Sequence, residues 1–187
     1  MNHLQHILFL GMIAIYTNVI YNVCINYTST DQSISSILKN TECNRIIFVN
    51  MIAMGTITLL YEGLRYDRFS LITMFFLVLG IYGVLYYDHT QIVHFVYCFV
   101  VFISILCFMV HHCCKTDDVL LYVSLGLQIL LCIVIFFESN IIHSEVYLLM
   151  NFAFFYIYLH FSSVSVIELH MPSPPPLPPL CNEPLCT

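Results

Sequence analysis

The chain has 187 residues, of which 60% are hydrophobic and only 9% are charged, and its formal net charge is −6. A soluble domain carries about a quarter charged residues on its surface, so this composition excludes an ordinary water-soluble fold. Binding of nucleic acid needs clustered Lys and Arg to neutralise phosphates, and the five basic residues exclude that partner as well. The first partner that the sequence predicts is therefore the lipid bilayer.

Long apolar stretches recur along the whole chain. A helix needs about 20 apolar residues to cross a hydrocarbon core of roughly 30 Å. Runs such as Leu71–Tyr87 and Phe95–Val110 are apolar on every face, which excludes the alternating pattern of a β-barrel strand. We therefore expect an all-α, polytopic membrane helix bundle in which six transmembrane helices form one domain over residues 1–170. The predicted spans are residues 5–25, 46–65, 70–87, 92–112, 118–137 and 145–167.

The connections between these spans are mostly short, so consecutive helices should be antiparallel neighbours. The exception is the Ser- and Thr-rich segment 26–45. Cys24 and Cys43 bracket this segment and are candidates for a disulfide, which would contribute about 3 kcal/mol if the segment lies in an oxidising compartment. Residues 171–187 (MPSPPPLPPLCNEPLCT) form a proline-rich tail that favours polyproline II over helix. We expect this tail to be either a spacer or a docking segment for protein partners such as SH3, WW or EVH1 domains.

The few basic residues indicate the orientation of the bundle. Arg65, Arg68 and Lys115 lie in the second and fourth connections, whereas Lys39 and Arg45 lie in the first. Lys and Arg accumulate in short cytosolic loops, so three residues against two predict that both termini are cytosolic. The chain is accordingly expected to be an integral, multi-pass membrane protein with a cytosolic tail.

Polar side chains within the spans are candidates for function because they are costly in hydrocarbon. The three amides among them are Asn50, Gln128 and Asn151. The plainer interpretation is that such amides form hydrogen bonds between helices and hold the bundle together. Glycines are predicted to let helices approach closely, and those within the spans are Gly55, Gly80, Gly83 and Gly126.

A second group of candidates combines carboxylates and imidazoles around the third and fifth turns, which six spans place on the same, lumenal side. The group consists of Asp88, His89, His94, His143 and Glu145. Such a cluster can bind a metal or transfer protons. Since the spacing matches no catalytic or metal-binding motif, a structural or pH-sensing role is favoured over a metal-binding or catalytic one. We expect no catalytic residue, no metal and no other cofactor.

The sequence His111-His-Cys-Cys114 lies at the cytosolic end of the fourth predicted span. Four adjacent residues do not easily reach one tetrahedral ion, so reversible palmitoylation of Cys113 and Cys114 is favoured over zinc binding. The simplest alternative is that these cysteines carry no modification.

Three stretches resemble a known family in the order of their features. Glu42-Cys43 precedes residues 46–66 (IIFVNMIAMGTITLLYEGLRY), which carry an Asn, a Gly and a terminal Arg-Tyr. Residues 77–102 combine paired glycines, a short turn and Val-His-Phe, and residues 145–169 open with Glu and carry Asn-Phe centrally. Together they resemble the damage-regulated autophagy modulators, the DRAM family of six-span membrane proteins. The chain departs from the family's pattern at Val146, where the family has Trp, and at Ser162 or Ser163, where it has Asp.

The resemblance implies a non-enzymatic protein of endosomal, lysosomal or plasma membranes that modulates autophagy or membrane lipid organisation. Two alternatives belong to other functional classes. One is an intramembrane lipid hydrolase that uses the lumenal His, Asp and Glu residues, and the other is a small channel or transporter. A polar cavity between the second, third, fourth and sixth spans would favour the enzyme, whereas an organising role needs none.

Overall fold

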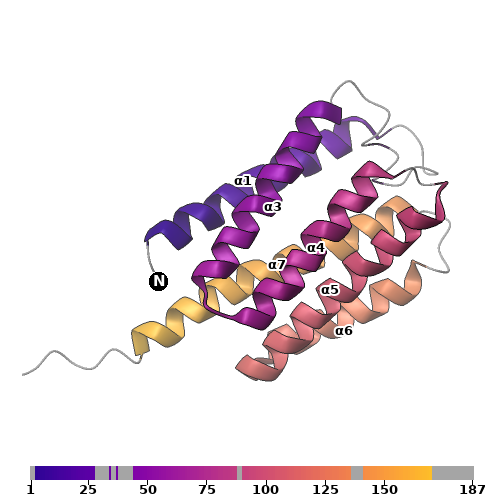
Figure 1. Ribbon diagram of the computed structural model, residues 1–187. Coiled ribbons are helices and arrows are strands. Elements are labelled where there is room, and N and C mark those ends of the chain that lie inside the picture. Colours follow the sequence, from indigo (N-terminus) through magenta and orange to yellow (C-terminus); the bar gives the residue numbers. More distant parts are fainter. Residues whose placement is uncertain are drawn as a thin grey trace, which may run out of the picture.

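The computed structural model describes residues 3–27, 34, 37, 44–87, 90–135 and 141–169, and every regular element in this part of the chain is helical. The expected all-α class is thus confirmed. In chain order the helices are α1 (His3–Ile25), α3 (Asn44–Leu64), α4 (Arg68–Tyr86), α5 (Ile92–Thr116), α6 (Val119–Val134) and α7 (Ile141–Leu169) (Figure 1).

Each helix overlaps one predicted span. Helix α7 begins at Ile141, before its predicted start at residue 145, and α5 runs on to Thr116, past its predicted end at residue 112. Its end is set by Asp117, which adopts the left-handed conformation (φ 50°) and donates its backbone N–H to the Cys113 carbonyl. Four helices are long and apolar enough to cross a membrane, namely α1, residues Ile46–Leu64 of α3, α4 and α5, and α6 is a shorter apolar helix. These helices indicate an integral membrane protein of the helical class.

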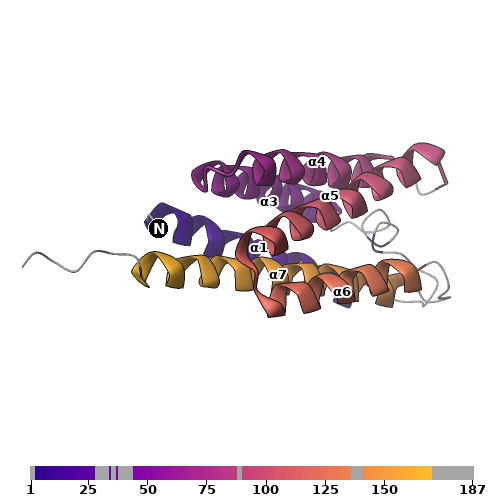
Figure 2. The same ribbon diagram turned by 90° about the horizontal axis from the view of Figure 1, so that it is seen from below.

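Consecutive helices pack as neighbours, and the most extensive contact joins α4 to α5. The chain also closes on itself, because α7 returns beside α1, where the His160 ring stacks on the Phe9 ring at 3.7 Å between centroids. Figures 1 and 2 show the start of α1 and the late part of α7 at the same end of the bundle. We call this the proximal end. It also carries the α3–α4 and α5–α6 connections, and the opposite end is the distal end.

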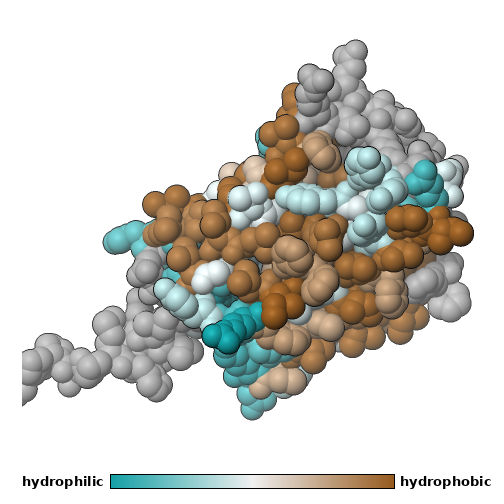
Figure 3. Space-filling view, viewed as in Figure 1, coloured by the Kyte–Doolittle hydropathy of each residue, from teal (hydrophilic) through white to brown (hydrophobic). Residues whose placement is uncertain are grey.

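The outer faces of the helices carry large apolar side chains. Ile7 of α1 is 65% exposed and Phe99 of α5 is 64% exposed, and hydrophobic surface covers most of the face seen in Figure 3. A soluble monomer rarely exposes so much contiguous apolar surface. Hydrophilic atoms in that view include a patch at the lower end, where α5 meets α6 in Figure 1, and smaller patches at the left and right edges. Hydrocarbon around the helices accounts for the exposure of these large apolar side chains.

The largest group of buried apolar side chains lies between α4, α5, α6 and α7. Its fully buried members include Met74, Phe108, Met109, Phe155 and Leu159. A smaller group at the distal end joins Val23 of α1 to Ile47 of α3 and to Ile37 between them.

Glycines explain how closely α4 approaches its neighbours. A Cβ on Gly83 would overlap the Tyr97 ring of α5, and one on Gly80 would lie 2.8 Å from Cγ2 of Val101. A Cβ on Gly55 of α3 would lie 2.6 Å from the Tyr82 hydroxyl of α4. The prediction of close approach was wrong for Gly126, because a Cβ there would meet no atom within 4 Å. That glycine lies on an exposed face of α6.

Candidate intramembrane site

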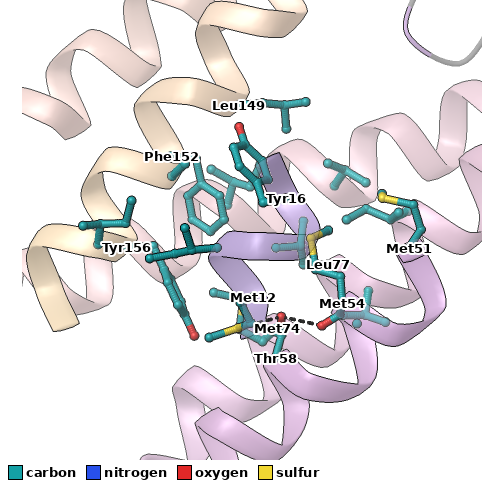
Figure 4. Close-up of a pocket in the computed structure, with 18 of the residues that line it drawn as sticks. Met12, Tyr16, Met51, Met54, Thr58, Met74, Leu77, Leu149, Phe152 and Tyr156 are labelled. Carbon is teal, nitrogen blue, oxygen red and sulfur yellow. Dashed lines mark hydrogen bonds between the residues drawn. The ribbon is translucent and has the colours of Figure 1, made fainter. Parts of the chain in front are cut away.

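A partly open cavity of about 370 Å³ lies between α1, α3, α4, α5 and α7 (Figure 4). Its walls are almost entirely apolar. Four methionines from three helices, Met12, Met51, Met54 and Met74, contribute to them, and Phe152 of α7 lies opposite. Flexible thioether side chains let a wall fit occupants of irregular shape. The volume falls within the range of roughly 300–1,000 Å³ that is usual for small-molecule sites.

The hydroxyl groups around the cavity differ in whether they already have a partner. Oγ1 of Thr58 lies 2.8 Å from the Met54 carbonyl oxygen and 3.2 Å from Sδ of Met12. The Tyr82 hydroxyl donates to the Ile52 carbonyl at 3.1 Å. By contrast, the buried Tyr16 hydroxyl has no hydrogen-bond partner among the residues that the structure describes, and Figure 4 shows it directed toward Leu149. Tyr16 is therefore the lining residue best placed to donate to an occupant.

Tyr156 connects the cavity to a buried polar network at the proximal end. Its ring lines the cavity, and its hydroxyl donates to Oε1 of Glu62. Glu62 is completely buried, and it also accepts from the Ser70 hydroxyl at 2.8 Å and from Arg65 Nη1 at 3.3 Å. Oγ of Ser70 lies 3.0 Å from Nε2 of His112. Helices α3, α4 and α7 thus meet at one carboxylate, and α5 joins them through the contact between His112 and Ser70.

The order of groups in this network matters for its chemistry. In a Ser-His-acid triad the imidazole lies between the serine and the acid, so that it can remove the hydroxyl proton. Here the Ser70 hydroxyl lies between Glu62 and His112 and donates directly to the carboxylate. All three side chains are buried, at 0%, 0% and 2% exposure for Glu62, Ser70 and His112. This geometry joins helices and does not present an activated nucleophile.

A second contact at the proximal end joins α1, α3 and α7. The Tyr61 hydroxyl lies 2.6 Å from Nδ1 of His160, whose Nε2 lies 3.2 Å from Nδ1 of His6. Both Tyr61 and His160 are buried. Together with the stacking of His160 on Phe9, these contacts fix α7 against α1.

Asp67 organises the surface of the proximal end. Its Oδ1 caps α4 by accepting from the Ser70 N–H at 3.2 Å, and its Oδ2 lies 2.8 Å from Lys115 Nζ and 3.0 Å from His111 Nε2. Burial raises the pKa of the Asp67 carboxyl, but the hydrogen bonds from Lys115, His111 and the Ser70 N–H outweigh that effect and hold the pKa well below its usual range. Asp67, His111 and His112 are also the described residues that could together hold a metal ion.

Two of the three predicted intramembrane amides meet between α6 and α7. The side-chain amide of Asn151 donates to Oε1 of Gln128 at 2.6 Å and to the Ser124 carbonyl at 2.9 Å, while the Ser124 hydroxyl donates back to Asn151 at 3.0 Å. Asn50 of α3 is separate, and its buried amide nitrogen has no partner among the described residues.

Three of the predicted lumenal residues, His94, His143 and Glu145, are described; they lie at the distal end, and each contacts a different partner. Nδ1 of His94 lies 3.3 Å from the Tyr87 carbonyl oxygen, and the exposed His143 ring lies 6.5 Å from the Tyr27 ring. Glu145 accepts from the Ile34 N–H at 2.7 Å. Asp88 and His89 lie outside the described residues. Among the described residues, none of these contacts joins His94, His143 and Glu145 to one another, and the larger polar network lies at the proximal end.

The cysteines predicted to be palmitoylated or to form a disulfide differ in their exposure. Cys113 is completely buried against the main core, whereas Cys114 is exposed, so Cys114 is the more accessible of the two residues for which palmitoylation stays a prediction. Cys24 has an exposed free thiol, and Cys43 lies outside the described residues, so the disulfide stays a prediction. The proline-rich tail 171–187 also lies outside them.

Sequence reasoning missed Glu62, Ser70, His112 and Tyr156 as a group. Glu62 stands two residues before the end of α3, a position where a lone carboxylate resembles a headgroup-facing residue. The available signal was that Glu62, Ser70 and His112 each fall near the same end of a different predicted span, whereas Tyr156 lies in the middle of its span. Hydrogen-bond partners on different helices cannot be assigned without the rotation of each helix about its axis.

Comparison of the chain with protein-family models, with curated proteins and with solved structures finds no match in any of the three.

Proposed function

We propose that this chain is a six-span, non-enzymatic membrane protein that holds the apolar part of a lipid in the cavity between α1, α3, α4, α5 and α7. The observation that carries the proposal is the cavity itself, about 370 Å³ with almost wholly apolar walls. An apolar void forfeits dispersion contacts and does not hold water. Inside a bilayer the surrounding hydrocarbon is the available occupant, and the cavity is partly open.

The six crossings are part of this proposal. Four helices meet the length and hydropathy of a span, and α6 and α7 pack on them as an antiparallel pair joined by the Asn151 and Gln128 contact. In this arrangement the proximal end, with both termini, faces the cytosol. The bias of Lys and Arg supports that orientation.

The resemblance to the DRAM family supports the biological setting that we propose. A protein that sequesters or orders lipid would modulate autophagy or lipid organisation in endosomal, lysosomal or plasma membranes, with the tail 171–187 recruiting protein partners. The cavity is apolar rather than polar, and Ser70 donates directly to Glu62. Both observations favour lipid holding over lipid hydrolysis.

Photocrosslinking tests the proposal. The full chain is reconstituted with a phosphatidylcholine that carries a diazirine within one acyl chain, irradiated, and mapped by peptide mass spectrometry. We expect crosslinks at cavity residues such as Met54 and Phe152 in addition to the outer faces. Filling the cavity with Ala153→Phe should remove the cavity crosslinks and leave the outer ones.

Ala14→Phe is the matched control, because it adds the same ring to an exposed position of α1 outside the cavity. Cavity crosslinks that persist in Ala153→Phe, or that are lost equally in Ala14→Phe, would count against lipid in the cavity. Crosslinks confined to outward residues such as Phe99 would do the same.

A further inference from the structure

Three metal-ligating side chains converge at the proximal end, outside the cavity. Asp67 lies in the α3–α4 connection, and His111 and His112 lie near the end of α5. One ligand atom from each can be chosen so that all three lie within 4.8 Å of one another. Asp67 caps the start of α4, and α4 packs along α5 in the most extensive contact between helices.

Each ligand is held in place by packing or hydrogen-bonding contacts. Asp67 uses Oδ1 to cap α4, so Oδ2 is the oxygen directed at His111. The His111 ring packs against Phe69 at 4.6 Å between centroids, and its side chain is 27% exposed, which opens the cluster to the aqueous side. The His112 ring packs against Phe108 at 4.5 Å.

A second layer of hydrogen bonds lies behind the cluster. Ser70 Oγ is 3.0 Å from Nε2 of His112 and donates to Glu62. Partners of this kind orient ligating imidazoles in metal sites. Two imidazoles and one carboxylate are a ligand set of Zn²⁺ sites that keep a fourth position open.

We propose that Asp67, His111 and His112 form a binding site for a divalent transition-metal ion, with Zn²⁺ as the best-matched ion. None of these three side chains lines the lipid cavity. Adjacent residues His111-His112 and a carboxylate from another element supply the ligands, and Cys113 and Cys114 take no part.

Lys115 is the group that competes with the ion. Its Nζ lies 2.8 Å from Asp67 Oδ2, and its side chain is 59% exposed. A long exposed lysine can move its ammonium group into water at little cost. The ammonium charge nevertheless opposes a cation at the same oxygen, so removing it should strengthen metal binding.

Metal binding to the purified chain tests the proposal. The full-length protein, prepared in detergent without a polyhistidine tag and stripped with chelator, is dialysed against buffered Zn²⁺ and its bound metal is measured by mass spectrometry. We expect one ion per chain. Loss of outer-layer partners alone weakens metal sites about 10–100-fold, so His111→Ala should weaken binding at least about tenfold. Size-exclusion chromatography reports whether that variant is folded.

His143→Ala is the matched control, because it removes an exposed histidine from the distal end and should leave binding unchanged. Lys115→Ala should bind Zn²⁺ more tightly than the unaltered chain, a gain that misfolding cannot produce. Absence of stoichiometric Zn²⁺, an equal loss in His111→Ala and His143→Ala, or weaker binding in Lys115→Ala would each overturn the site.

Discussion

Glu62 shows how a single carboxylate can join several helices. It is completely buried and accepts hydrogen bonds from Tyr156, Ser70 and Arg65. A buried carboxylate is costly unless its oxygens are satisfied, and here three donors share that task. Removing any one donor leaves part of the cost without compensation. The network should therefore be sensitive to the loss of a single hydroxyl.

Tyr156→Phe tests this sensitivity, since it removes the hydroxyl that donates to Glu62 and keeps the ring that lines the cavity. We expect the free energy of unfolding to fall by about 1–2 kcal/mol, the range for a buried hydrogen bond to a charged group within a membrane bundle. Denaturant titration in mild detergent measures the change.

The control for that variant is Tyr147→Phe, at a tyrosine of the same helix that is 60% exposed. It should change the free energy of unfolding by less than about 0.5 kcal/mol. If the two variants are equally stable, the Tyr156 hydroxyl does not support Glu62 as described.

At the scale of elements, the closest helix pair is α4 with α5. Gly83 faces the Tyr97 ring and Gly80 faces Val101, so the absence of side chains on α4 sets the distance between the helices. Small residues at membrane helix interfaces increase dispersion contacts, which are a main source of helix association in lipid. The same pair positions Asp67 beside His111.

Gly83→Ala should therefore separate α4 from α5, because the added methyl group overlaps the Tyr97 ring near its attachment rather than at a flexible end. Overpacking of this kind costs about 1–3 kcal/mol in the free energy of unfolding. Thermal unfolding in detergent measures the change.

Gly126→Ala provides the comparison, because its Cβ meets no atom within 4 Å. Alanine has the higher helix propensity, so that variant should be neutral or more stable by up to about 1 kcal/mol. A destabilisation of Gly126→Ala as large as that of Gly83→Ala would contradict the assigned role of Gly83.

The sequence indicated the helices well but the contacts between them poorly. Apolar runs and short connections predicted α1 and α3 to α7 in the described part of the chain, because hydrocarbon permits few other structures. A contact of the kind that Gln128 makes with Asn151 could be predicted from the sequence, since amides in spans commonly form hydrogen bonds between helices. The cavity could not be predicted from the sequence, because it depends on how the helices that carry Phe9, Met54 and Phe152 are rotated toward one another. A uniform apolar pattern carries no signal for that rotation.

At the scale of the whole molecule, the account depends on α6 and α7 both crossing the bilayer. As described, α6 has 16 residues. At 1.5 Å per residue such a helix is about 24 Å long, shorter than a typical hydrocarbon core of roughly 30 Å. Four crossings and six crossings both place the two termini on one face, so locating the termini does not distinguish them. The side of the membrane on which the α6–α7 connection lies distinguishes four crossings from six.

The most direct test is protease protection in sealed microsomes, with one epitope inserted within residues 136–140 and another placed after Thr187. Six crossings put the inserted epitope on the lumenal face, where it is protected, and leave the terminal epitope open to protease. Cleavage of both epitopes without detergent would show that α6 and α7 do not cross, and it would contradict the six-span bundle on which the lipid-holding cavity depends.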